Sequence, residues 1–278
     1  MKPGIVFVIA NQKGGVGKTT TAIMLKDEFS KTLNLKTLVI DYDPQGSLTA
    51  LLDIEKEEKN NYNKDGSICN LFNKEDVTIL EYDTNTDIII SDSKLNNAFY
   101  SVKSGRELML KKFLEKIKHD YDAIIIDTKP DLGGASLVSA ILAADVIINP
   151  IATGGIEEDA TVEFYEKLEE TVDIYGNNIK KIFVIPTLVD QSRDSKSTLL
   201  SIKNYLPELY SKKYKTLSQS TQIEILKAVP RRAAIKNSTG VKVSVRQYIE
   251  EFDTGKKDVL LDIENMAKTI WKGGKNNG

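Results

Sequence analysis

The chain has 278 residues, of which 41% are hydrophobic, 28% charged and 7% aromatic, a composition typical of globular domains and unlike that of disordered or fibrous chains. A total of 38 Lys and Arg against 40 Asp and Glu gives a net charge of −2, which excludes a uniformly basic nucleic-acid coat protein but allows a local basic patch. The single cysteine, Cys69, excludes an internal disulfide and a cysteine-based metal centre and is typical of a reducing compartment.

Short apolar runs alternate with helical segments from residue 5 to about residue 190. Uninterrupted apolar runs are typical of parallel strands that helices cover on both faces. The pattern therefore predicts one α/β domain over residues 1–278, with a doubly wound, mostly parallel sheet and helices on both faces. The predicted strands are 5–10, 37–40, 88–90, 123–126, 146–148 and 182–185, and the predicted helices between them are 19–32, 106–119, 136–144 and 157–175.

Three regions fall outside this alternation. Residues 55–65 combine charged residues and Asn without apolar periodicity, and we expect an exposed loop there. Residues 192–237 are predicted to be helical and rich in basic residues. A last helix is predicted at about 256–272, followed by a disordered tail at 273–278.

No segment is predicted to export the chain or to span a membrane. The apolar run at 5–10 is too short for a signal peptide, and the longest later run, 135–152, is interrupted by Asp145, Asn149 and Pro150. We therefore expect a cytoplasmic protein.

A glycine-rich loop lies between the first predicted strand and the first predicted helix. Its residues are Lys13, Gly14, Gly15, Val16, Gly17, Lys18, Thr19 and Thr20. The glycines allow backbone N–H groups to surround phosphates, Lys18 can reach the β- and γ-phosphates, and the Thr19 hydroxyl can coordinate Mg²⁺. Because the loop has a strand before it and a helix after it, the pattern favours an ATP-type nucleotide site over an incidental turn.

Three aspartates end predicted strands and are candidate groups for the γ-phosphate and its Mg²⁺. Asp41 and Asp43 are two residues apart, so their side chains point the same way along an extended chain. Taken alone, the second of them could equally belong to a β-turn with Pro44. Asp127 follows a buried strand, the position from which an acidic residue holds Mg²⁺ in P-loop proteins.

Together these motifs resemble the deviant Walker A class of P-loop ATPases, the ParA/MinD family. Gln12 stands where the ordinary loop begins with Gly, and an additional lysine, Lys13, follows it. The pair Asn11-Gln12 is more similar to the ParA/Soj branch of DNA-partition ATPases than to the MinD branch. The resemblance implies that Lys13 reaches phosphates bound by a second subunit, that Asp43 positions or activates the attacking water, and that Asp41 supports the Mg²⁺ shell.

The resemblance extends over most of the chain, from residue 4 to about residue 270. The segment 142–150 and the segment 228–231 are both similar to stretches of the family. One departure is Lys129, which stands where the family usually has the first of two prolines after the acidic residue of this strand.

The resemblance implies a slow ATPase that partitions plasmid or chromosomal DNA. ATP would drive homodimerisation and sequence-independent DNA binding on the nucleoid, and a ParB-type centromere-binding partner would stimulate hydrolysis. The implied DNA contacts are Arg231, Arg232 and Lys236, and a second basic cluster lies at 212–215, although either set could simply be a solvated face. Because the first predicted strand begins at residue 5, no N-terminal helix-turn-helix is expected.

Two other functions stay open from the sequence. A MinD-like ATPase would cycle on a membrane through an amphipathic helix, and residues 259–271 have an apolar set, although such spacing is more typical of a helix packed on a sheet. A metabolic P-loop ligase or kinase would have an acceptor pocket and would need neither DNA nor a partner. Redox relatives of the family need paired cysteines, which this chain lacks.

Overall fold

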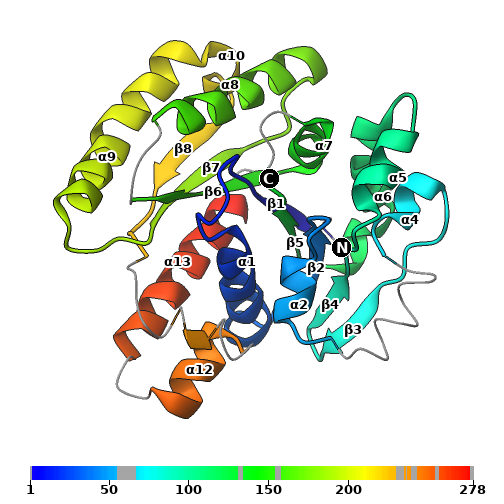
Figure 1. Cartoon of the computed structure of the whole chain (residues 1–278), viewed down its shortest axis with the longest axis horizontal. Coiled ribbons are helices and arrows are strands. Elements are labelled where there is room, and N and C mark those ends of the chain that lie inside the picture. Colours follow the sequence, from blue (N-terminus) through cyan, green and yellow to red (C-terminus); the bar gives the residue numbers. More distant parts are fainter. Residues whose placement is uncertain are drawn as a thin grey trace.

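The computed structural model describes residues 2–54, 67–130, 134–153, 158–229, 235, 237–238, 243–253 and 257–275. Within them the chain forms an eight-stranded sheet of order β3-β4-β2-β5-β1-β6-β7-β8 (Figure 1). The strands are β1 (Ile5–Ile9), β2 (Thr37–Tyr42), β3 (Leu80–Asp83), β4 (Thr86–Ile89), β5 (Ala123–Thr128), β6 (Val146–Ala152), β7 (Lys181–Thr187) and β8 (Gln222–Ile225). All neighbouring strands are parallel except β3 and β4. The predicted doubly wound, mostly parallel α/β fold is therefore confirmed.

All six strands predicted from apolar runs are present, with ends that differ by a few residues. The structure adds two edge strands, β3 and β8, which the sequence did not predict. The prediction of helix throughout residues 192–237 was wrong at β8, which pairs in parallel with β7. β8 and its flanking residues contain too few consecutive apolar residues to stand out from the amphipathic helices before them.

Helices cover both faces of the sheet (Figure 1). They are α1 (Lys18–Asp27), α2 (Ser47–Leu51), α4 (Asn70–Asn73), α5 (Leu95–Ser101), α6 (Met109–Ile117), α7 (Ala135–Ala143), α8 (Glu158–Tyr175), α9 (Arg193–Lys213), α10 (Lys215–Ser218), α12 (Val245–Phe252) and α13 (Lys257–Lys275). Because strand side chains alternate, Val6 and Val8 of β1 join a core with helices α4 to α10, whereas Phe7 and Ile9 join a second core with α1, α2, α12 and α13.

The last helix, α13, packs its apolar face into the second core. Ile263, Ala267 and Ile270 are buried there, as the helical spacing predicts, and so is Val259. The prediction of disorder from residue 273 was wrong for residues 273–275, which continue α13, and Gly273 and Gly274 are buried; residues 276–278 lie outside the described residues. No helix in the described part of the chain has the length and apolar character needed to cross a bilayer.

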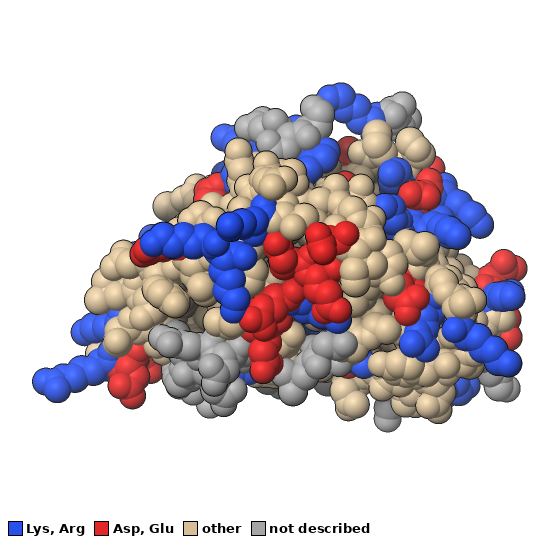
Figure 2. Space-filling view, turned by 90° about the horizontal axis from the view of Figure 1, so that it is seen from above, with Lys and Arg blue, Asp and Glu red and all other residues tan. Residues whose placement is uncertain are grey.

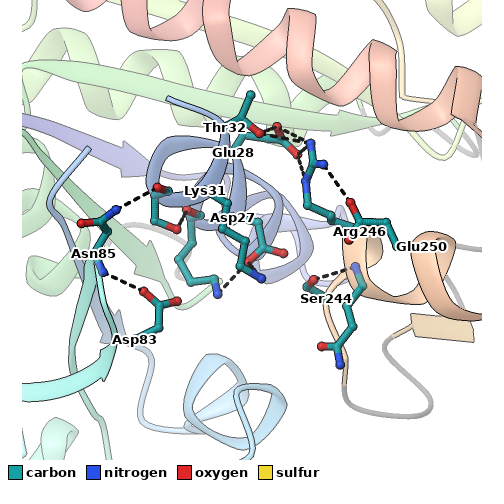
Figure 3. Close-up of polar contacts among 12 residues, drawn as sticks. Asp27, Glu28, Lys31, Thr32, Asp83, Asn85, Ser244, Arg246 and Glu250 are labelled. Carbon is teal, nitrogen blue, oxygen red and sulfur yellow. Dashed lines mark hydrogen bonds and ion pairs between the residues drawn. The ribbon is translucent and has the colours of Figure 1, made fainter. Parts of the chain in front are cut away.

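An ionic cluster around the buried Glu28 fastens α12 to the end of α1 (Figure 3) and also includes α13. After α1 the chain makes one wide π-helical turn, Glu28–Thr32. Arg246 of α12 donates from Nε and Nη2 to the Glu28 carboxylate at 2.9–3.0 Å, and Nη2 also reaches Glu264 of α13 at 2.9 Å. The Glu28 side chain is only 1% exposed. One guanidinium thus joins the turn after α1 to two helices near the other end of the chain, more than 200 residues away.

Candidate nucleotide-binding site

The glycine-rich loop connects β1 to α1 at the carboxyl edge of the sheet (Figure 1). Gly15 and Gly17 have φ values of 73° and 93°, in the left-handed region that residues with a Cβ atom avoid. α1 begins at Lys18, so the last three residues of the motif already form the first turn of the helix. The backbone is therefore shaped as a phosphate loop that leads into a helix N-terminus, where backbone N–H groups favour an anion.

Two side chains hold the start of this loop. Asn11 donates from Nδ2 to the Pro150 carbonyl at 2.8 Å and accepts at Oδ1 from the Lys13 N–H at 2.8 Å. Lys18 donates from Nζ to the Lys13 carbonyl at 2.9 Å, so its side chain spans the loop. Burial lowers the pKa of Lys18, and the nearby carboxylates of Asp127 and Asp43 oppose that shift.

The paired aspartates at the end of β2 have different surroundings: Asp41 lies within the strand and Asp43 directly follows it. Asp41 is fully buried, and its Oδ2 accepts from the backbone N–H and the hydroxyl of Thr49 at 2.8 and 2.7 Å, while Oδ1 accepts from the Asp43 N–H at 3.2 Å. Asp41 therefore fixes the loop that leads from β2 to α2. Burial raises the pKa of Asp41 to about 6. The Oδ1 of Asp43 accepts from the Gln45 N–H at 2.8 Å.

Asp127 lies beside Asp41 in the register of β2 and β5. It is 1% exposed, and neither carboxylate oxygen makes a hydrogen bond of ordinary geometry within the described residues. Burial raises the pKa of Asp127 to about 8 and the Asp41 carboxylate adds to this shift, whereas the nearby Thr19 hydroxyl and the Lys18 ammonium oppose it. A buried, unsatisfied carboxylate beside a hydroxyl and a second acid is an arrangement that a bound cation would stabilise.

Lys129 departs from the family pattern without interrupting β5. Its Nζ donates to Oδ1 of Asn96 in α5 at 3.1 Å, and a Cβ atom built at Gly14 would lie 3.9 Å from the adjacent Pro130 ring. The segment after Asp127 is thus tied to α5 and lies against the glycine-rich loop.

The structure brings together at this edge all the sequence-predicted groups for nucleotide and metal. These are Lys13, Gly14, Gly15, Val16, Gly17, Lys18, Thr19, Thr20, Asp41, Asp43 and Asp127. The predicted DNA contacts Arg231, Arg232 and Lys236, and the predicted loop 55–65, lie outside the described residues. Two residues that sequence reasoning missed are Thr49 and Thr187, single threonines with no spacing signal, which bond respectively to Asp41 and to the Val16 carbonyl.

Residues 4–183 match the family model described as an AAA domain. The Soj protein of Bacillus subtilis, a sporulation initiation inhibitor, is 31% identical over 200 residues, which cover 70% of this chain and 76% of that protein. The chain belongs to the ParA/Soj family of P-loop ATPases. A further member, the chromosome partitioning protein ParA of Myxococcus xanthus, is 33% identical over 177 residues, or 62% of this chain and 59% of its own length.

Solved structures of this ATPase fold superpose along almost the whole chain. A plasmid partition protein from Borrelia burgdorferi B31, crystallised with AMPPNP, has a TM-score of 0.71 at 26% identity and covers 94% of this chain and 98% of its own. McdA from Cyanothece has a TM-score of 0.74 at 23% identity, with 97% and 98% covered, and shares the fold.

Proposed function

We propose that the chain binds ATP with Mg²⁺ at the glycine-rich loop and hydrolyses it to drive DNA partition. The unsatisfied Asp127 carboxylate at 1% exposure, beside Lys18 and Thr19, carries the proposed MgATP site. The similarity to partition proteins supports the proposed role in DNA partition. Asp127 and the Thr19 hydroxyl would hold the cation, which would neutralise charge on the phosphates. Asp41 would support this shell indirectly, since its own oxygens bond to Thr49 and to the Asp43 backbone.

ATP would join two subunits face to face, with Lys13 of each contacting phosphates bound by the other. Gly14 and Gly15 are exposed and Lys13 is half-buried, so the outer side of the loop is accessible to a second subunit. Asp43, 8% exposed and electrostatically coupled to Lys18, would position the attacking water.

In the ATP state the protein would bind DNA without sequence preference, on the nucleoid, through the segment that contains Arg231, Arg232 and Lys236. The competing basic cluster is less suited to phosphate contacts, because Lys212 pairs with Glu208 and Lys213 with Glu166, both at 2.6 Å. Figure 2 shows acidic side chains gathered near the centre of the face that lies at the top of Figure 1, with basic ones around them. That face is therefore not a continuous basic surface. A ParB-type protein would stimulate hydrolysis.

The test is binding to random-sequence duplex DNA with ATP, ADP or no nucleotide across a salt series. We expect ATP-dependent binding that weakens steeply with salt, and a shallower slope for Arg231→Ala/Arg232→Ala than for the wild type. Lys212→Ala/Lys213→Ala is the matched control and should keep the wild-type slope. Equal binding in all nucleotide states, or none in any, would contradict the proposal.

The two alternatives have distinct signatures in the same samples. A membrane-cycling ATPase would sediment with anionic vesicles in ATP, but the apolar face of α13 is already buried in the second core. A metabolic ligase or kinase would turn over at ordinary enzyme rates with a small-molecule acceptor, and neither DNA nor a partner would change that rate.

A further inference from the structure

Thr187, the last residue of β7, contacts the glycine-rich loop from the side of the sheet. Its side chain is buried, and Oγ1 donates to the Val16 carbonyl at 2.7 Å. The contact joins residues that are 171 positions apart in the sequence. It directly links the end of β7, which β6 separates from β1 in the sheet, to the backbone expected to surround phosphate.

The position of Thr187 is fixed by the strands around it. It pairs with Ala152 of β6, and its carbonyl accepts from the N–H and the hydroxyl of Thr153 at 3.0 and 3.3 Å. The next residue, Leu188, has a φ of 56°, a left-handed conformation that is rare for a branched residue and ends the strand abruptly. Thr187 therefore presents its hydroxyl to the loop from a rigid support.

The Val16 carbonyl and the Gly17 N–H belong to the same planar peptide unit, and no peptide bond in the described residues is cis. In a trans peptide these two groups point in opposite directions. When Thr187 holds the carbonyl toward β7, the Gly17 N–H must point away from β7. At Gly17 the backbone has a φ of 93°, so no Cβ atom opposes this orientation.

We propose that Thr187 is a positioning residue for phosphate binding, because its hydroxyl holds the Val16–Gly17 peptide with the Gly17 N–H aimed at the nucleotide phosphates. The inference rests on the proposed nucleotide site at this loop. Loss of the hydroxyl frees the peptide to rotate and leaves a carbonyl without its donor. Loss of the hydroxyl should therefore weaken the binding of any ligand held by its phosphates, whether or not that ligand carries a base.

Thr187→Val keeps the shape of the side chain but removes the hydroxyl donor, whereas Thr187→Ser keeps the hydroxyl and removes only the methyl group. MgADP affinity is measured by calorimetry, and inorganic pyrophosphate affinity by competition. We expect both affinities to weaken about tenfold in Thr187→Val, within the range of one lost hydrogen bond, and to return to within twofold of wild type in Thr187→Ser. If Thr187→Val does not fold, Thr187→Ala replaces it in the comparison with Thr187→Ser.

The matched control is Thr221→Val. Thr221 is also buried and donates to a carbonyl, that of Ile179, at 2.6 Å. It precedes β8, which runs parallel to β7, and so lies at the amino ends of the strands, away from the glycine-rich loop. This variant should lose thermal stability while binding both ligands within twofold of wild type. Unchanged binding in Thr187→Val, or weakening confined to MgADP, would overturn the inference. Failure of the wild type to bind either ligand would instead overturn the proposed nucleotide site.

Discussion

Arg246→Ala should strongly lower the free energy of unfolding, because it removes the partner of a buried carboxylate. Arg246 is the cationic partner of Glu28, whose side chain is 1% exposed. Removing one member of a buried ion pair leaves an uncompensated charge and costs about 3–5 kcal/mol. Because Glu28 keeps a hydrogen bond from the Thr32 hydroxyl at 2.6 Å, we expect the lower end of this range, about 3 kcal/mol.

The free energy of unfolding is measured by urea titration followed by circular dichroism. Lys212→Ala, which breaks the exposed Lys212–Glu208 pair, is the control and should not change the midpoint measurably. Adding Glu28→Gln to Arg246→Ala removes the stranded charge, so the double variant should lose less stability than the single one. An Arg246→Ala midpoint equal to that of Lys212→Ala would refute the reasoning.

The pH dependence of this loss has a defined sign. Burial already raises the pKa of Glu28 in the presence of Arg246, and removal of the guanidinium should raise it further. As the pH falls through that raised pKa, Glu28 becomes neutral and the stranded charge disappears. The stability difference between wild type and Arg246→Ala should therefore be smaller at pH 5 than at pH 8, and a difference that grows on acidification would contradict this account.

Four further predictions follow from the site and from α13. Asp127→Asn should raise the free energy of unfolding of the magnesium-free protein relative to wild type, and this gain should grow by about 1 kcal/mol per pH unit from pH 4 to pH 8. The reason is that the pKa of Asp127 is raised to about 8, so the wild type must take up a proton to fold in this range. Thermal melts in EDTA check this, and a pH-independent difference would contradict it. Asp43→Ala should bind ATP but release phosphate far more slowly in a coupled assay, and wild-type turnover would remove Asp43 from the mechanism. Lys13→Ala should still bind ATP but stay monomeric by light scattering, and a normal ATP-dependent dimer would exclude the cross-subunit contact. Gly273→Ala should cost about 1–3 kcal/mol in a urea titration, because its Cβ atom would lie 2.5 Å from the Phe183 ring, and an unchanged midpoint would show that the ring moves aside freely.

The centre of the fold was predictable because buried parallel strands leave continuous apolar runs. β5 reads Ala-Ile-Ile-Ile-Asp-Thr and is buried throughout, so both its type and its position follow from the residues. The edge strand β3 has the sequence Leu-Glu-Tyr-Asp, and four residues with mixed polarity do not distinguish a strand from a loop. Such a segment becomes a strand because it pairs with a neighbouring strand, and its own four residues do not show that pairing.

The glycine-rich loop was predictable for a different reason, since its residues are adjacent and their spacing is restrictive. Thr187 and Arg246 act across 171 and 218 positions, respectively, and neither stands in a local pattern. The prediction of a disordered tail was wrong at residues 273–275 because a Gly-Gly pair suggests disorder, whereas Gly273 and Gly274 allow α13 to approach the sheet closely. Close packing of this kind depends on the partner surface and not on the segment alone.

The two outermost strands of the sheet limit strand-to-strand pairing between copies of this protein. β3 and β8 are each four residues long, and they carry Glu81 and Asp83 in one case and Glu224 in the other. Short edge strands with charged side chains resist pairing with a strand of another molecule. Irregular register between Glu81 and Asp83 further disrupts a regular ladder at the β3 edge. Sheets that continue from one molecule into the next are therefore disfavoured, and a high protein concentration should not by itself lead to fibril-like aggregation through these edges.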